Sequence, residues 1–180
     1  MHKGSLLILG LCVTIAVVQL SAAEKGPVMK LQKTQLGSTN PVHLCGKVYL
    51  AGQPGSQDLK EAKRLGVECV VSLRDPGELP WNEAEAAKEA GLKFLQLPVK
   101  SPDALTDEVF DKVREILRDS ADHSVLLHCG AAVRVGAVWL AFRVLDQGVP
   151  YEQALAEAHT IGLRVPAYEA KAKAYIEARR

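Results

Sequence analysis

The sequence predicts a three-layer α/β domain, with a mainly parallel central sheet flanked by helices on both faces. Short apolar runs of strand length alternate with longer segments of helical periodicity, which is typical of parallel sheets. The chain has 180 residues, of which 48% are hydrophobic and 24% charged, enough for one globular domain with its own core. We find no internal repeat or low-complexity tract that would indicate a second domain.

Capping and turn residues delimit the predicted elements. Ser56 is a suitable N-cap for a helix that stops at Gly66. Asn82 and Glu85 form a capping-box pair that opens a helix ending at Gly91. The predicted strands are residues 47–50, 67–73, 93–97 and 125–128. The predicted helices are residues 56–65 and 82–91, one that begins at Thr106 or Asp107, and residues 136–147, 151–160 and 166–178.

The hydrophobic patterns place these elements in the fold. The run 67–73 is largely apolar, as expected for a strand covered on both faces. The helix that begins near Thr106 has one apolar face, whereas the helix 136–147 is apolar on most sides and therefore suits the centre of the domain.

The candidate functional site follows the strand 125–128. Cys129 opens a loop of small residues, Arg134 closes it, and a helix begins at about Gly136. Small residues allow successive backbone N–H groups to converge at the helix N-terminus, where they bind an anion. The same positive field lowers the pKa of a cysteine, and the planar arginine fork holds two oxygens of an oxyanion. The sequence therefore predicts an oxyanion cradle with a nucleophile at its floor; its backbone lining is Gly130, Ala131, Ala132 and Val133.

The stretch from His128 to Arg134 resembles the signature loop of cysteine-dependent phosphatases of the tyrosine and dual-specificity type. That loop reads His-Cys, five residues and Arg, whereas here four residues separate Cys129 from Arg134. The chain is most similar to a bacterial branch that uses this shorter spacing, which many rhodanese-like sulfurtransferase loops share. Two further departures are Val135, where many of these phosphatases have Ser or Thr, and Ala132, where the branch often has Gly. A left-handed backbone turn is harder for alanine.

The resemblance covers roughly Val48 to Leu163. The other matching landmarks are Tyr49–Pro54, Leu73–Arg74, Gly91–Leu92 and Leu97–Val99. It implies a phosphatase-like domain over residues 43–180 that needs no cofactor. It also implies that Cys129 attacks phosphorus to form a thiophosphate intermediate, that Arg134 holds the phosphate oxygens, and that His128 supports the loop. The implied substrate is a phosphorylated protein or a small phosphate ester.

A phosphatase of this type needs a carboxylic acid that protonates the leaving oxygen. The resemblance implies an Asp a few residues after Leu97–Pro98, where Lys100 and Ser101 stand instead. Asp103 is the best candidate and Asp107 the second. Asp75 also follows a strand, although Asp-Pro-Gly is typical of a turn.

Two other functions remain open at this point. In a rhodanese-like sulfurtransferase, Cys129 would carry a persulfide, and no acid of the phosphatase type would be needed. In a non-catalytic oxyanion-binding module, ligand binding would survive Cys129→Ser, and neither the natural chain nor the variant would be active.

The charge pattern excludes several classes of partner. Lys3 is the only Lys or Arg in the first 23 residues, so the rest of the chain carries one fewer than the 22 of the whole, against 21 Asp and Glu. A net charge of zero does not indicate a nucleic-acid or membrane-surface partner. His43, His123 and His159 have no partners at metal-ligand spacing, so we predict no metal site.

Residues 1–23 have the pattern of a secretory signal peptide, which predicts a periplasmic or secreted protein without a stable membrane span after cleavage. An uncleaved N-terminal anchor is the alternative. Residues 24–42 are expected to be a flexible lead-in, because they are rich in Gly, Pro and Asn and lack apolar periodicity. The remaining cysteines are Cys45, Cys69 and Cys129; a Cys45–Cys69 disulfide and two separate thiols are both open.

Overall fold

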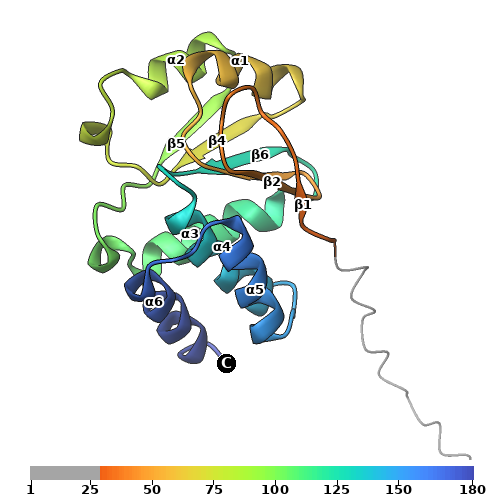
Figure 1. Cartoon of the computed structure of the whole chain (residues 1–180), viewed down its shortest axis with the longest axis vertical. Coiled ribbons are helices and arrows are strands. Elements are labelled where there is room, and N and C mark those ends of the chain that lie inside the picture. The colour runs from red at the N-terminus through yellow and green to blue at the C-terminus, as the bar shows by residue number, and fades with distance from the viewer. Residues whose placement is uncertain (1–28) are drawn as a thin grey trace, which may run out of the picture.

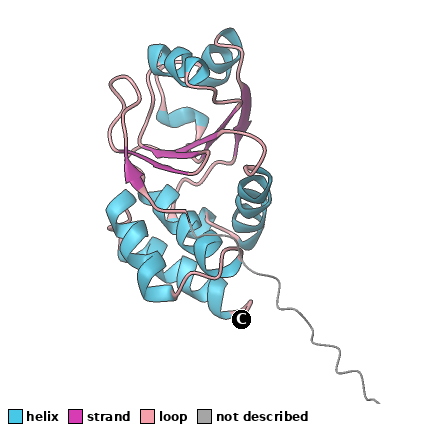
Figure 2. Ribbon diagram, turned by 90° about the vertical axis from the view of Figure 1, so that its right-hand side faces the viewer, coloured by secondary structure: helices cyan, strands magenta, loops and turns pink. Residues whose placement is uncertain are grey.

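The computed structural model describes residues 29–180, and the predicted signal peptide lies outside the described residues. These residues form a six-stranded mixed sheet between two layers of helices (Figures 1 and 2). The strand order is β1-β2-β3-β6-β4-β5. The strands are β1 (Gln32–Lys33), β2 (Val42–Cys45), β3 (Val48–Ala51), β4 (Cys69–Ser72), β5 (Lys93–Gln96) and β6 (Val125–His128).

The four strands β3, β6, β4 and β5 are parallel, as the alternation of strands and helices predicts. In their register Ala51 and Ser72 both pair with His128, so three strands end level with one another. The carboxyl ends of these strands therefore lie side by side at one edge of the sheet. Ligands bind at this edge in open α/β sheets.

The helices divide between the two faces of the sheet. α1 and α2 cover one face, and α3, α4, α5 and α6 cover the other (Figure 1). The helices are α1 (Ser56–Arg64), α2 (Glu83–Glu89), α3 (Asp107–Asp119), α4 (Val133–Leu145), α5 (Tyr151–Ile161) and α6 (Pro166–Glu177), and two short 3-10 helices are η1 (Pro76–Glu78) and η2 (Pro102–Ala104). The predicted three-layer architecture is confirmed.

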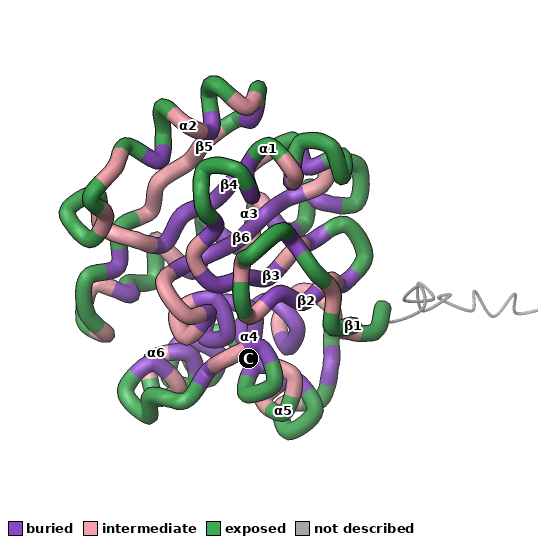
Figure 3. The backbone as a smooth tube through the Cα atoms, turned by 45° about the horizontal axis from the view of Figure 1, so that its top comes forward, coloured by how far each residue is buried: buried purple, intermediate pink, exposed green. Residues whose placement is uncertain are grey.

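Helix α4 is the central helix of the larger layer, and Figure 3 shows it buried along most of its length. It packs closely on α5 at Gly136, where an added Cβ would lie 2.8 Å from the carbonyl oxygen of Ala158. The helix begins at Val133 rather than at the predicted Gly136, because Ala132 takes a left-handed conformation (φ 58°) and turns the chain into the helix there.

The described part of the predicted lead-in, residues 29–42, differs from the expectation of flexible chain. β1 pairs with β2, which in turn pairs antiparallel with β3, and Leu36 is fully buried. The carboxylate of Asp58 in α1 accepts hydrogen bonds from Ser38 N at 3.0 Å and Thr39 Oγ1 at 2.8 Å. These contacts come from a helix about twenty residues further along the chain, so no local pattern in residues 29–42 indicates them.

Cys45 and Cys69 are separate thiols. Cys45 lies on β2 and Cys69 on β4, and β3 and β6 stand between these strands. Three strand spacings amount to about 14 Å. A disulfide requires Cα atoms within about 7 Å.

Among residues 29–180, none of the helices has the length and apolar character that a membrane span needs.

Candidate active site

The signature loop leaves the carboxyl end of β6 and is held against the segment that follows β3. Cys129 N donates to Ala51 O at 3.3 Å, and Gly130 O accepts from Gln53 N at 3.1 Å. A single β-bridge joins Gly52 to Ala131. The thiol of Cys129 is almost fully buried at the start of this loop, as a nucleophile at the floor of a cradle requires.

The loop leaves several backbone donors available. Within residues 29–180, the N–H groups of Gly130, Ala131 and residues 133–135 donate to no backbone carbonyl, and the first helical bond runs from Gly136 N to Ala132 O at 2.9 Å. The first N–H groups of any α-helix lack intrahelical partners. Those of α4 therefore add to the unpaired donors of the loop that follows Cys129, and unpaired N–H groups at a helix N-terminus are suited to bind an oxyanion.

Ala132 adopts the left-handed backbone conformation that is unfavourable for a residue with a Cβ atom. Ala132 is the only described residue besides glycine with a positive φ, and its side chain is fully buried. Gly162, which follows α5, packs directly against it with φ 147°. A Cβ at Gly162 would lie 2.9 Å from Ala131 O and 3.2 Å from the Cβ of Ala132.

We expect Gly162→Ala to destabilise the protein by about 2 kcal/mol or more, because it combines backbone strain with a clash. It should also lower catalytic activity, since the atoms that must move belong to the signature loop. Gly66→Ala is the matched control: Gly66 has φ 87°, but an added Cβ there meets nothing within 4 Å. It should cost about 1 kcal/mol and leave activity unchanged. Urea unfolding and activity assays test both; equal losses of activity in the two variants would contradict the argument.

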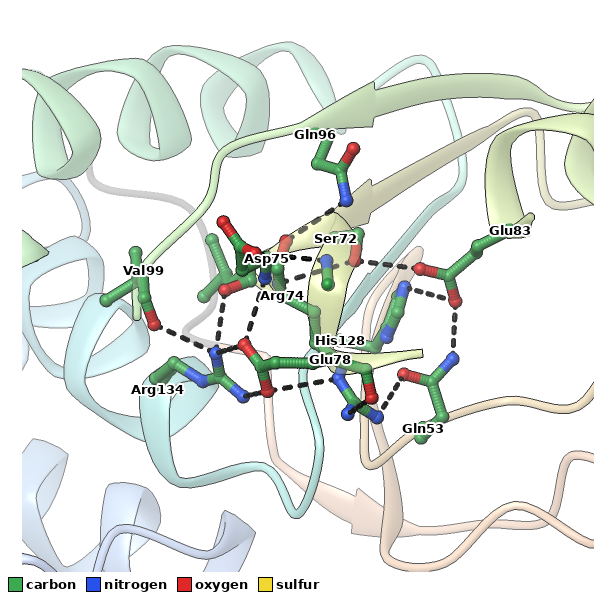
Figure 4. A network of polar contacts seen from close by, with 12 residues as sticks. Gln53, Ser72, Arg74, Asp75, Glu78, Glu83, Gln96, Val99, His128 and Arg134 are labelled. Carbon is green, nitrogen blue, oxygen red and sulfur yellow. Dashed lines mark hydrogen bonds and ion pairs between the residues drawn. The ribbon is translucent and has the colours of Figure 1, made fainter. Parts of the chain in front are cut away.

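Arg134 folds back over the loop and joins three segments at the edge of the sheet (Figure 4). Its Nη1 donates to Leu73 O at 3.0 Å, after β4, and to Val99 O at 2.9 Å, after β5. It also forms a two-point ion pair with Glu78, with distances of 2.8 and 2.9 Å. The guanidinium therefore stands beside the cradle in a fixed orientation.

Glu78 is the partner that holds this orientation. Arg74 Nε also donates to it at 3.2 Å, and Asp75 N donates at 2.9 Å. The hydrogen bonds from Arg134 lower the pKa of Glu78 to about 2, even though partial burial works against this shift. Glu78 is therefore an ionised carboxylate at neutral pH. Glu78 is not among the site residues that the sequence predicts.

The pKa of Glu78 predicts how stability depends on pH. Because the folded pKa lies below the ordinary value of 4.5, the stabilisation is present above that value and is lost as the pH falls towards about 2. We expect Glu78→Gln to be less stable than the natural chain by about 1 kcal/mol at pH 7, a modest value since the side chain is partly exposed. Thermal unfolding between pH 7 and pH 2 should show this gap closing at acid pH; a constant gap would contradict the assignment.

His128 lies behind Cys129 on the opposite face of the sheet. It is fully buried, and burial lowers the pKa of its imidazole to about 3, so the ring is neutral. Its Nε2 lies 3.3 Å from Oε1 of Glu83, at the start of α2. Glu83 is itself buried and accepts hydrogen bonds from Ser72 Oγ at 2.9 Å and from Gln53 Nε2. A neutral, fully buried histidine fits the supporting role that the resemblance implies. No pattern in the sequence indicates Glu83 or its contact with His128.

The structure does not bring Asp103 together with Cys129 and Arg134. Asp103 lies on η2 with its side chain 94% exposed, and it pairs with Lys171 of α6 at 3.1 Å. Its role as proton donor stays a prediction. Asp107, the second candidate, pairs with Arg179 at 3.1 Å on the outer side of α3.

Asp75 is the carboxylate candidate nearest to the arginine network. Its backbone N–H donates to Glu78. Its side chain accepts a hydrogen bond from Gly77 N at 3.0 Å and forms an ion pair with Lys100 at 3.3 Å. The turn expected at Asp75-Pro76-Gly77 is confirmed, and it also positions Glu78. Within residues 29–180, no three His, Cys, Asp or Glu side chains are grouped to hold a metal ion.

Comparison with known proteins gives a family for this arrangement. The family described as "PTP-SAK: Swiss Army Knife protein, DSP-PTPase phosphatase domain" matches residues 46–160. A beta-lactamase hydrolase-like protein of Xylella fastidiosa is 27% identical over 121 residues, which is 64% of this chain and 28% of that protein. The chain thus spans less than a third of the length of this relative.

Solved structures share the fold. TpbA of P. aeruginosa is 24% identical with a TM-score of 0.65, and the match covers 86% of this chain and 92% of TpbA. A putative phosphatase (DUF442) of Shewanella putrefaciens is 18% identical with a TM-score of 0.62, covering 85% and 92% of the two chains. The family match spans β3 to α5 and so includes the signature loop and the Arg134 network. The chain therefore belongs to the PTP-SAK family of dual-specificity-type phosphatase domains.

Proposed function

We propose that this protein hydrolyses a phosphate monoester through a thiophosphate intermediate on Cys129. The observation that carries the proposal is the placement of Cys129 and Arg134 at the two ends of one loop whose backbone N–H groups are free to bind an anion. The family match, to a phosphatase domain, favours phosphoryl transfer over sulfur transfer or simple anion binding.

In the first step the Cys129 thiolate attacks phosphorus, an S–P bond forms, and the bond from phosphorus to the leaving oxygen breaks. The backbone N–H groups of the loop and the fork of Arg134 stabilise the charge that develops on the equatorial oxygens. In the second step water attacks phosphorus, the S–P bond breaks, and inorganic phosphate and the thiolate are released.

The leaving oxygen needs a proton in the first step. Asp103 is the proposed donor. Because its carboxylate is paired with Lys171 in the structure, the 102–104 segment would have to turn towards the cradle when a substrate binds. Asp75, which lies next to the Arg134 network, is the alternative donor.

For the substrate we propose a phosphorylated protein or a small phosphate ester. A structure of TpbA, 22% identical to this chain with a TM-score of 0.64, is described as a complex with pTyr, and this favours aryl phosphates as first substrates to test. The localisation, periplasmic or secreted, rests on residues 1–23 of the sequence and stays a prediction.

The test is hydrolysis of an aryl phosphate under reducing conditions, with acid quenching during turnover. We expect release of the phenol, and we expect the quenched protein to carry a phosphoryl group on Cys129. Transfer of sulfur from thiosulfate to cyanide by the same sample, without hydrolysis of the phosphate ester, would overturn the proposal in favour of a sulfurtransferase.

A further inference from the structure

One buried carboxyl group connects the ends of three parallel strands beneath the signature loop. Glu83 opens α2 and is only 4% exposed. It accepts a hydrogen bond from Ser72 at the end of β4 and one from Gln53, which follows β3. It also lies 3.3 Å from the imidazole of His128 at the end of β6. Figure 4 shows these four side chains around a common point.

Two of these contacts lead directly to the signature loop. His128 is the residue before Cys129. Gln53 donates its backbone N–H to Gly130 O at 3.1 Å, so the residue after Cys129 is also tied to this group. The cluster continues to the arginines, since Arg74 Nη1 donates to Gln53 Oε1 at 3.0 Å. Arg74 in turn holds Glu78, the partner of Arg134.

Burial of the Glu83 carboxyl group lowers the stability of the fold, so a purely structural role does not account for it. Burial raises the pKa of its carboxyl group and lowers that of His128. Neither ring nitrogen of His128 has a hydrogen bond of normal geometry within residues 29–180, although its Nε2 lies 3.3 Å from the Glu83 carboxylate. A buried polar group with few hydrogen-bond partners destabilises the folded protein, so its presence indicates a role other than stability.

We propose that Glu83 is a positioning residue of the active site, which fixes the signature loop on both sides of Cys129 through His128 and Gln53. The expected effect on turnover rests on the proposed function, whereas the expected effect on the reactivity of Cys129 does not. Glu83 lies on the α1–α2 side of the sheet, whereas Cys129 faces the α4 side, so Glu83 acts through the strand ends and never on the substrate.

Two substitutions separate position from charge. Glu83→Ala removes every link, and loss of a negative charge alone would not slow the alkylation of Cys129. The proposal predicts slower alkylation by iodoacetamide, by about tenfold at pH 7, because a displaced loop no longer holds the Cys129 sulfur against its backbone donors. Glu83→Gln can still accept from Gln53 at one position and donate to the Ser72 hydroxyl at the other, so its alkylation rate should not fall.

Turnover of an aryl phosphate should follow the same order. We expect Glu83→Ala to lose about 100-fold in kcat with a smaller change in KM, which is the size of effect that a displacement of about 1 Å causes. Glu83→Gln should retain most of the activity. If the natural chain does not hydrolyse phosphate esters at all, the alkylation series still tests the position of Cys129, so failure of the proposed function and failure of this inference are distinguishable.

Asp58→Ala is the matched control for stability. Asp58 is also a buried carboxylate in the first turn of a helix on the same face, and it binds Ser38, Thr39 and Gly55 without touching the signature loop. This variant should be less stable but should show the natural rate of Cys129 alkylation. If Glu83→Ala does not fold, Gln53→Leu breaks one of the two links and should slow alkylation in the same direction.

The overturning result is a folded Glu83→Ala protein, or Gln53→Leu in its place, that alkylates at the natural rate or faster. Equal slowing in Glu83→Ala and Asp58→Ala would also overturn the proposal, because general destabilisation would then account for the effect.

Discussion

Replacement of Cys129 by serine is expected to lower the hydrolysis of an aryl phosphate by about 10⁵-fold or more, since loss of the nucleophile has an effect on this order in other enzymes that use a covalent intermediate. The thiolate is the attacking species, and a serine hydroxyl at the same place has no comparable way to ionise near neutral pH. The substitution leaves every backbone contact of the loop in place, including the bond from Cys129 N to Ala51 O.

The same variant should still bind the anion. Calorimetric titration with inorganic phosphate should give similar affinities for the natural chain and Cys129→Ser, because Arg134 and the backbone donors are unchanged. Cys69→Ser is the matched control: Cys69 begins β4, at the opposite end of that strand from the cradle, and its loss should not affect turnover. Residual turnover in Cys129→Ser close to the natural rate would place the nucleophile elsewhere.

The parts of the site that could be predicted are those that lie close together in the sequence. Cys129, the small residues after it and Arg134 occupy one uninterrupted stretch between a strand and a helix, so their chemistry is visible without the fold. The parallel strands and their helices could also be predicted, because each has its own apolar pattern and its own terminal glycine or cap. Predicted and observed bounds differ by at most three residues, and the strand 125–128 has the predicted bounds.

The parts that could not be predicted depend on contacts between distant segments. β1 has two residues, and both it and β2 form by pairing with neighbouring strands rather than from a pattern of their own. Glu83 precedes His128 by 45 residues and meets it only when α2 folds over the end of the sheet. Asp103 was selected by its distance along the chain from β5, but η2 packs against α6 and directs the side chain outwards.

One signal for Glu78 was present in the sequence. Arg74 and Glu78 follow the strand that ends at Ser72, and charged residues just beyond the carboxyl end of a parallel strand fall at the ligand-binding edge of the sheet. The capping box of Asp75 and Glu78 around η1 brings them within reach of Arg134. What the sequence lacked was any indication that this turn faces the loop after β6 and not solvent.

Arg134→Lys is expected to lower turnover by about 10³-fold, the effect of removing an optimally placed donor to a developing oxyanion. A lysine ammonium is a point charge and cannot present two parallel N–H groups to a phosphate. It also cannot maintain all the contacts of Arg134 with Leu73 O, Val99 O and both oxygens of Glu78, so we expect a loss of about 2 kcal/mol in stability.

A buried arginine further along the same helix separates these two effects. Arg143 lies in α4, is fully buried, and makes a two-point ion pair with Glu157 at 2.7 Å, far from the cradle. Arg143→Lys should therefore lose stability to a similar extent while its turnover, measured well below the unfolding temperature, stays within a few-fold of the natural value. If instead both variants lose turnover in proportion to stability, Arg134 serves only to hold the loops after β4 and β5 together. If Arg134→Lys alone loses turnover and phosphate binding, the guanidinium beside Cys129 is the group that binds the phosphate oxygens in the transition state.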